Sequence, residues 1–334
     1  MEKLANIYKR PLAVFFLPTP PREPPLPEDF RSLPQDQRKP FSEKTRLAIR
    51  RARRLQSLVV ELAGGLDRDI IPQIGRASVS DDPEIVASRV REELGVEIRT
   101  QFSWTNRTEA LDAWKKAVEK RGVFVFQIGM PQEDGVRAFS LLENKPPAIV
   151  LNLWDVINGR IFSLFHEYGH LLLNASGICN TEEIDNLSGE AKSIEEFCNH
   201  FAGAVLVPKD TLLKHELVRS KEYSTQWSDE ILKELAEIFK VSQEVILRRL
   251  VIFDQADKDF YKSKREEWKP LAHRRGWGPP NPPKKCIQKN GTAFVSLVLD
   301  SHRKEKITYR DVADYLAIHA KYLPKIEQFI EGKV

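Results

Sequence analysis

The amino-acid sequence predicts an α+β fold that is mostly helical, with a small sheet preceding a buried helix in mid-chain and a helical C-terminal region. Short apolar runs separated by turn residues predict the strands, over 123–128, 136–142 and 148–152. A longer apolar run from Ile161 to Leu173 follows the last strand. Helical periodicity dominates the rest of the chain, so helices should far outnumber strands.

The composition is that of a globular protein with an ample core. The chain of 334 residues is 41% hydrophobic and 30% charged, and its formal net charge is +4. This mild charge gives no global argument for a nucleic-acid-binding protein. The three cysteines, Cys179, Cys198 and Cys286, form no CxxC pair, which is typical of a reducing compartment. No run is long enough to span a membrane and no signal peptide is recognisable, so we expect a cytoplasmic protein without a membrane partner.

Residues 1–40 are predicted to form an N-terminal arm and a proline-rich linker. The arm should begin as a short helix from Glu2 to Lys9. It continues into an apolar run from Leu12 to Leu17, which we expect to dock on the body of the protein. Seven prolines between residues 19 and 40 predict an extended linker.

Amphipathic helices are predicted before the sheet, over 41–64, 83–95 and 108–121. Their expected N-caps are Ser42, Asp82 and Thr108, because short polar side chains satisfy the free amides of a first helical turn. The first helix carries five arginines between Arg46 and Arg54. They could form a face for nucleic acid or an acidic partner. A solvated helix face is the favoured interpretation, because no aromatic side chains are interleaved with them.

The apolar run at 161–173 contains His166-Glu167-Tyr168-Gly169-His170. On a helix, two histidines four residues apart project from one face and can bind one Zn²⁺, with Glu167 beside them to accept a proton from a water on the metal. The same pattern would fit an amphipathic helix with two incidental histidines. The apolar surroundings favour the metal, because a buried polar group needs a partner. Gly169 is expected to leave room beside the second histidine.

A catalytic zinc usually takes three protein ligands, so a third is expected downstream. A second buried helix is predicted over 191–207, and Glu195 on it is the best candidate. Glu196 and His200 are its rivals, and a surface carboxylate near a helix start is the alternative without a metal. Asn199 lies on the same face as Glu195 and could hydrogen-bond a metal ligand.

The remaining segments are assigned by pattern. The polar stretch 174–192 is predicted to be a loop over the site. Residues 209–272 are predicted to be helical, and 232–250 within them resembles a helix-turn-helix with its turn at Val241-Ser242. Contact with DNA is one hypothesis for this unit, and structural packing, favoured by its several glutamates, is the other.

A proline-rich linker over 273–286 precedes a last helical pair, over 290–303 and 308–331, whose second helix should begin with a capping box of Thr308 and Asp311. The expected domain organisation is an arm and linker (1–40), the core with the sheet and both site helices (41–208), a helical helix-turn-helix-like subdomain (209–272), and a linker with a helical region (273–334).

Several of these segments resemble the ImmA/IrrE family of zinc metallo-endopeptidases. The resemblance covers about 122–208 and rests on Pro147–Asn152, Arg160–Leu173, Glu195–Ala202 and Leu206–Pro208. It implies a zincin-like, gluzincin-type core over 41–208. It also implies one Zn²⁺ per chain bound by His166, His170 and Glu195, with Glu167 as the general base.

The resemblance also implies a substrate class. Members of this family typically cleave a helix-turn-helix repressor or transcription factor and so switch on a stress, mobile-element or phage programme. The alternative is a metal-containing regulator or binding protein with little or no proteolysis. In many longer relatives an XRE-type helix-turn-helix domain precedes a segment like Leu4–Leu17, and here we expect most of that domain to be absent. Gly291–Leu299 also resembles those relatives.

Overall fold

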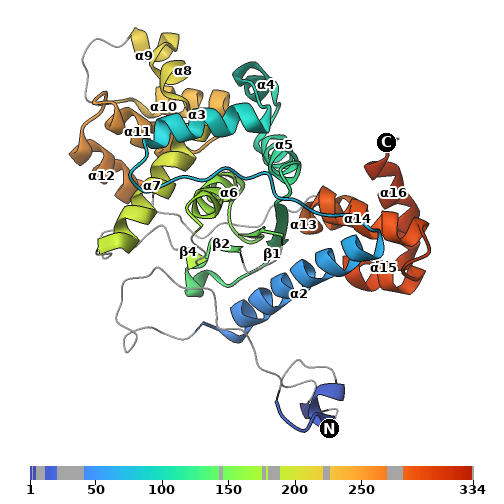
Figure 1. The fold of residues 1–334 in the computed structure, drawn as a ribbon. Coiled ribbons are helices and arrows are strands. Elements are labelled where there is room, and N and C mark those ends of the chain that lie inside the picture. Colours follow the sequence, from blue (N-terminus) through green and yellow to red (C-terminus); the bar gives the residue numbers. More distant parts are fainter. Residues whose placement is uncertain are drawn as a thin grey trace.

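The computed structural model describes residues 1, 3–4, 12–20, 41–142, 146–174, 178–179, 189–220, 226–268 and 281–332. Its α-helices are α2 (Glu43–Gly65), α3 (Pro83–Leu94), α4 (Ile98–Ser103), α5 (Arg107–Glu119), α6 (Ile157–Leu172), α7 (Gly189–Leu206), α8 (Lys209–Leu213), α9 (Glu216–Arg219), α10 (Asp229–Phe239), α11 (Gln243–Ile252), α12 (Lys258–Glu267), α13 (Pro282–Asn290), α14 (Thr292–Arg303), α15 (Tyr309–Leu316) and α16 (Leu323–Ile330). Its strands are β1 (Phe124–Ile128), β2 (Ala138–Leu141), β3 (Ala148–Asn152) and β4 (Ile178–Cys179). The fold is α+β and mostly helical, as expected (Figure 1).

The sheet has the strand order β1-β3-β2-β4. Strands β1 and β3 are parallel, whereas β2 runs antiparallel to both β3 and β4. The three predicted strands are therefore confirmed. Strand β4 falls inside the stretch that was expected to be a loop, and its two residues are too short to give a period-two pattern. Residues 175–177 and 180–188 of that expected loop lie outside the described part of the chain, and its last residues, 189–192, belong to α7.

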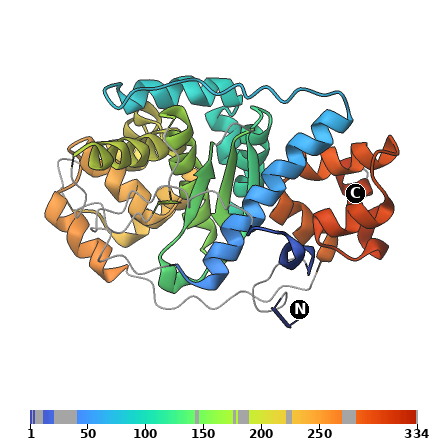
Figure 2. The same ribbon diagram turned by 60° about the horizontal axis from the view of Figure 1, so that its bottom comes forward.

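The two faces of the sheet serve two hydrophobic cores, because successive side chains of a strand point to opposite faces. Val125 and Ile149 belong to the core that also contains the buried residues of α5, α6 and α7. Phe126 and Val150 belong to the core formed with α2 and the C-terminal helices. Figure 2 shows α2 crossing the sheet, with those helices beside it. Helix α6 therefore lies on one face of the sheet, and α2 with the C-terminal helices covers the other.

The helix starts before the sheet were predicted with one error. Ser42 caps α2 by accepting a hydrogen bond from the Thr45 amide, and Asp82 caps α3. Thr108 is not the cap of α5. Asn106 is, because its side-chain oxygen accepts from the amides of Thr108 and Glu109. Helix α4 was not anticipated, since six residues carry too little periodicity to recognise.

The N-terminal arm differs from the expectation. The segment η1 (Leu12–Phe16) is a 3₁₀ helix with no buried residue. Phe16 is 70% exposed and Leu17 51%, whereas Val14 and Phe15 are half-buried, so this apolar run is not buried in a core. Five residues make fewer than two turns of 3₁₀ helix, which is too short to present a continuous apolar face. Most of the predicted helix from Glu2 to Lys9, the linker from 21 to 40, and 273–280 lie outside the described residues.

Helices α10 and α11 enclose the predicted turn. Lys240 adopts a left-handed backbone conformation, and Ser242 caps α11. All residues of α11 are buried or half-buried, and α12 packs against it. The contacts of α11 are consistent with a packing role for this unit, and DNA contact stays a hypothesis.

The C-terminal helices were predicted only in part. The capping box of Thr308 and Asp311 is confirmed. The expected single helix over 308–331 is divided into α15, the 3₁₀ helix η5 (Ala320–Tyr322) and α16, because Ala317 takes a positive φ that ends α15. Helix α13 occupies part of the expected linker, and it begins at Pro282, a position that suits proline. Within the described residues, no helix combines the length and the apolar character that crossing a membrane requires.

Buried polar groups of α5 hold the C-terminal helices. The Glu119 carboxylate accepts hydrogen bonds from the amides of Thr292 and Ala293 at the start of α14, at 3.1 and 3.2 Å. The Lys115 ammonium donates to the carbonyl of Gln288 in α13, at 2.7 Å. A side chain at Gly291 would clash with the Glu119 carboxylate, so glycine is needed at this approach.

Replacing Glu119 with Gln should change the pH dependence of stability. Burial raises the pKa of Glu119 to about 7, although Lys115 and the two amides oppose the shift. The folded state therefore binds this proton more tightly than the unfolded chain does. As the pH rises from about 4 to 8, the free energy of unfolding of the wild type should fall relative to the variant by on the order of 3 kcal/mol. Urea unfolding across this range measures it, and parallel pH profiles would refute it.

Candidate metal centre

Helix α6 carries the histidine motif, and its residues from Ser163 to Leu172 are all buried. It packs on β2 and β3, on α5 and on α7, which is why its residues from Ser163 to Leu172 are mainly apolar apart from the motif (Figure 1). His166 is 1% exposed, and Glu167 and His170 are fully buried. The helix confirms the expected placement of the two histidines on one face, one turn apart.

Glu195 of α7 meets both histidines. Its carboxylate oxygens lie 3.3 Å from Nε2 of His166 and 3.2 Å from Nε2 of His170. The two Nε2 atoms are 3.2 Å apart. Atoms about 2.0–2.1 Å from a tetrahedral metal are about 3.3 Å from each other, so this triangle has the size that a zinc ion requires. Two imidazole nitrogens and a carboxylate are also a donor set typical of catalytic zinc.

The electrostatics of the cluster suit a cation. Burial alone would raise the pKa of the Glu195 carboxyl, but the charges and hydrogen bonds of His166 and His170 hold it well below its usual range. The carboxylate is thus in the deprotonated form that binds a metal. Among the described residues, His166, His170 and Glu195 form the one group of this kind whose ligand atoms all lie within 4.8 Å of one another.

The two other candidates for the third metal ligand, Glu196 and His200, do not face the histidines. The Glu196 side chain is 59% exposed and lies 4.0 Å from the Lys192 ammonium. His200 faces Glu84, with 2.6 Å between its Nε2 and the carboxylate. The structure thus brings only Glu195 of these candidates to the histidines.

Two neighbours of the cluster act differently from the expectation. The Asn199 amide donates to the main-chain carbonyl of Glu195, at 2.7 Å, rather than to a ligand side chain. Gly169 does not mainly leave room beside His170. A Cβ there would lie 3.1 Å from Sγ of Cys198 and 3.2 Å from Cδ1 of Phe201. Glycine at this position therefore allows α7 to pack closely against α6. Close approach of α6 and α7 is what brings Glu195 to the histidines.

One contact beside α7 could not be anticipated from sequence patterns. Arg249 forms a bidentate ion pair with Glu84, which also accepts from His200. Glu84 and Arg249 are 165 residues apart, and neither belongs to a recognisable motif. Their ion pair could be identified only from the three-dimensional structure.

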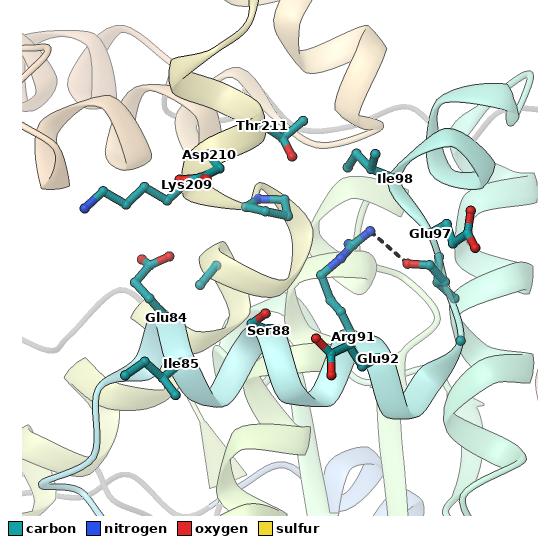
Figure 3. A pocket seen from close by; sticks show the side chains of 14 residues that line it. Glu84, Ile85, Ser88, Arg91, Glu92, Glu97, Ile98, Lys209, Asp210 and Thr211 are labelled. Atoms are coloured by element: carbon teal, nitrogen blue, oxygen red, sulfur yellow. Dashed lines mark hydrogen bonds between the residues drawn. The ribbon is translucent and has the colours of Figure 1, made fainter.

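A cavity of about 770 Å³ lies between α3, the turn after it and α8. Figure 3 shows Arg91 and Ser88 projecting from α3 into it, opposite Lys209 and Thr211. None of the three residues of the metal cluster lines this cavity. The cavity is thus separate from the candidate metal centre.

Residues 118–251 match the model of a peptidase family described as the IrrE N-terminal-like domain. No curated protein matches the chain significantly. The matched region contains the sheet up to β4, α6, α7 and the helices as far as α11. It therefore includes every residue of the metal cluster and Glu167.

Proposed function

We propose, from the premise that residues 118–251 belong to the ImmA/IrrE peptidase family, that this protein is a zinc-dependent endopeptidase. The observation that carries the proposal is the convergence of His166, His170 and Glu195 on one point, with Glu167 next to the first histidine. Composition and fold would suit many activities. This cluster inside a peptidase domain suits peptide hydrolysis.

The residues divide the chemistry between them. Nε2 of His166, Nε2 of His170 and the Glu195 carboxylate would hold the Zn²⁺, which when bound polarises a carbonyl and acidifies a water molecule. Glu167 accepts the proton of the attacking water as a general base. The same carboxyl group then donates this proton to the leaving amine. Burial of the site excludes bulk water, which strengthens the electrostatic interactions within it.

The substrate that we propose is a regulatory protein, namely a helix-turn-helix repressor whose cleavage switches on a stress or mobile-element response. The resemblance of the Arg160–Leu173 and Glu195–Ala202 segments to ImmA/IrrE sequences supports this substrate class. The metal cluster itself specifies how a peptide is cut and leaves the choice of peptide to surfaces around it.

One observation favours a second function, that of a metal-containing regulator with little proteolysis. His166, Glu167, His170 and Glu195 are each at most 2% exposed. A peptide therefore cannot reach them until part of the protein moves. A protein that stayed closed would bind metal without cutting.

Incubation with a candidate substrate tests the proposed function. Zinc-loaded protein is mixed with a purified helix-turn-helix repressor of the XRE type as the candidate regulator, and the products are analysed by intact-mass spectrometry. We expect two fragments whose masses sum to that of the regulator plus one water. Removal of the metal with a chelator should stop the reaction, and added Zn²⁺ should restore it. An intact regulator beside fully zinc-loaded protein would favour the second function.

A further inference from the structure

Charged side chains from three helices meet on one side of α7. Glu84 of α3 accepts from Nη1 and Nη2 of Arg249 on α11, at 2.5 and 2.8 Å. Nε2 of His200 on α7 lies 2.6 Å from the same carboxylate. Figure 3 shows Glu84 on α3 below Lys209, at one end of the cavity. We call Glu84, His200 and Arg249 the α7 clamp.

The α7 clamp lies opposite the contact between α7 and α6. Cys198 of α7 faces Gly169 of α6. A helix turns about 100° per residue, so His200 lies about 200° around α7 from Cys198. Glu195 is about 60° from Cys198 by the same measure and faces the two histidines of α6. Helix α7 is thus held between α6 on one side and the α7 clamp on the other.

Arg249 also fixes the end of α7. Its side chain is 1% exposed, and its Nε donates to the carbonyl of Val207, directly after the last residue of α7, at 3.0 Å. Its guanidinium lies over the ring of Phe253, 4.5 Å from the centroid. A Cβ on Gly203 would lie 3.1 Å from Cδ of Arg249. The absence of a side chain at this position therefore lets the Arg249 side chain pack against α7. The arginine therefore limits both rotation and sliding of α7.

We propose that the α7 clamp positions Glu195 for metal binding. This inference rests on the proposed metal centre. A metal site needs its ligands within about 0.5 Å of their places, and Glu195 is the one protein ligand that α6 does not carry. Its place is set by the rotation of α7, and the α7 clamp fixes that rotation from the far side. Glu84, His200 and Arg249 are positioning residues, since none of them contacts the cluster.

The electrostatics support a clamp that stays charged. Burial would raise the pKa of Glu84, but the hydrogen bonds from Arg249 and His200 outweigh it and lower the pKa to about 2. The carboxylate is therefore ionised at neutral pH and holds a buried arginine in a bidentate pair. Because α11 supplies that arginine, the metal centre depends on the α10–α12 unit, and a partner that displaced α11 would loosen Glu195.

Zinc affinity tests the positioning role without any substrate. The variants are His200→Ala, which removes the hydrogen bond between α7 and Glu84, and His200→Gln, whose amide can still donate to Glu84. Glu92→Gln is the control for a surface substitution near the α7 clamp, because Glu92 is an exposed carboxylate of α3 that does not belong to the clamp. Zinc dissociation constants are measured by chelator competition, and unfolding of the metal-free proteins by urea. We expect His200→Ala to bind zinc several-fold to about tenfold more weakly, near the lower end of the range for groups that hydrogen-bond metal ligands directly. His200→Gln should recover most of this loss, and Glu92→Gln should match the wild type.

The possible outcomes test the positioning role of the α7 clamp separately from the existence of the metal centre. Wild-type affinity in folded His200→Ala, or equal losses in His200→Ala and His200→Gln, would overturn the positioning role. A residue that merely stabilises the fold would lower the unfolding midpoint of the metal-free protein and leave the zinc dissociation constant unchanged. If the wild type bound zinc no more tightly than a His166→Ala variant, the metal centre itself would fail, and the clamp with it. Glu84→Gln is a poorer test, because it leaves the Arg249 charge buried without its carboxylate.

Discussion

Replacing Glu167 with Gln is expected to abolish peptide cleavage while the protein still binds zinc. The amide has nearly the same shape as the carboxylate but cannot accept a proton from water. Loss of a general base typically lowers a rate by about 10²–10⁴-fold. Glu167 is not among the residues that converge on the metal position, so the three ligands should be unaffected. The measurement is the rate of regulator cleavage at equal zinc occupancy.

The zinc content and the unfolding midpoint of the Glu167→Gln variant serve as its controls. Both should equal those of the wild type. A variant that keeps its zinc and cuts at the wild-type rate would remove Glu167 from the mechanism. If the regulator is still inactivated in cells that carry this variant, then inactivation does not depend on proteolysis, and the second function gains support.

Replacing Glu195 with Ala should have the largest effect on metal binding. The substitution removes one of the three converging ligands and leaves two imidazoles, which lie 3.2 Å apart between their Nε2 atoms. The loss of affinity should exceed the roughly 10–100-fold that partners outside the ligand shell contribute. Zinc content after dialysis against a weak chelator measures it. We expect the wild type to retain one zinc per chain and the variant to retain almost none.

Glu196→Ala is the matched control for this substitution. Glu196 is the next residue of α7, carries the same side chain and is 59% exposed. Its removal should leave zinc binding unchanged. The assignment of the third ligand would be reversed by full zinc occupancy in Glu195→Ala together with loss in Glu196→Ala.

The parts of the site that could be predicted are those that depend on residue spacing and apolar periodicity within one helix or strand. The i,i+4 spacing of His166 and His170 is a property of one helix and needs no tertiary information. Glu195 could be favoured over Glu196 because the apolar period of α7 places the first on its buried face. The predicted strands followed from apolar runs of a length that suits a buried sheet.

The parts that could not be predicted depend on contacts between distant segments. Strands β1 and β3 pair in parallel, but the sequence of neither strand indicates its partner or its direction of pairing. The ion pair of Glu84 and Arg249 joins two helices that share no motif. Gly169 could be seen as unusual in a helix, but its reason is the close approach of α7. Asn106 instead of Thr108 as the cap of α5 shows the usual uncertainty of helix ends.

The arrangement of the two cores bears on how the site is built. Helices α2 and α14 contribute Ile49 and Phe294 to the core on one face of the sheet, and α6 lies on the other face. The sheet therefore separates the C-terminal helices from the metal cluster. Any influence of those helices on the site must pass through the strands, or through α5, to which Glu119 and Lys115 attach them.

Anomalous X-ray diffraction from crystals of the zinc-loaded protein, recorded on both sides of the zinc absorption edge, tests the central claim most directly. We predict one strong peak per chain, about 2.0–2.2 Å from Nε2 of His166, Nε2 of His170 and a carboxylate oxygen of Glu195. A zinc peak held by any other set of side chains, or no peak at this cluster in protein shown to contain zinc, would contradict it.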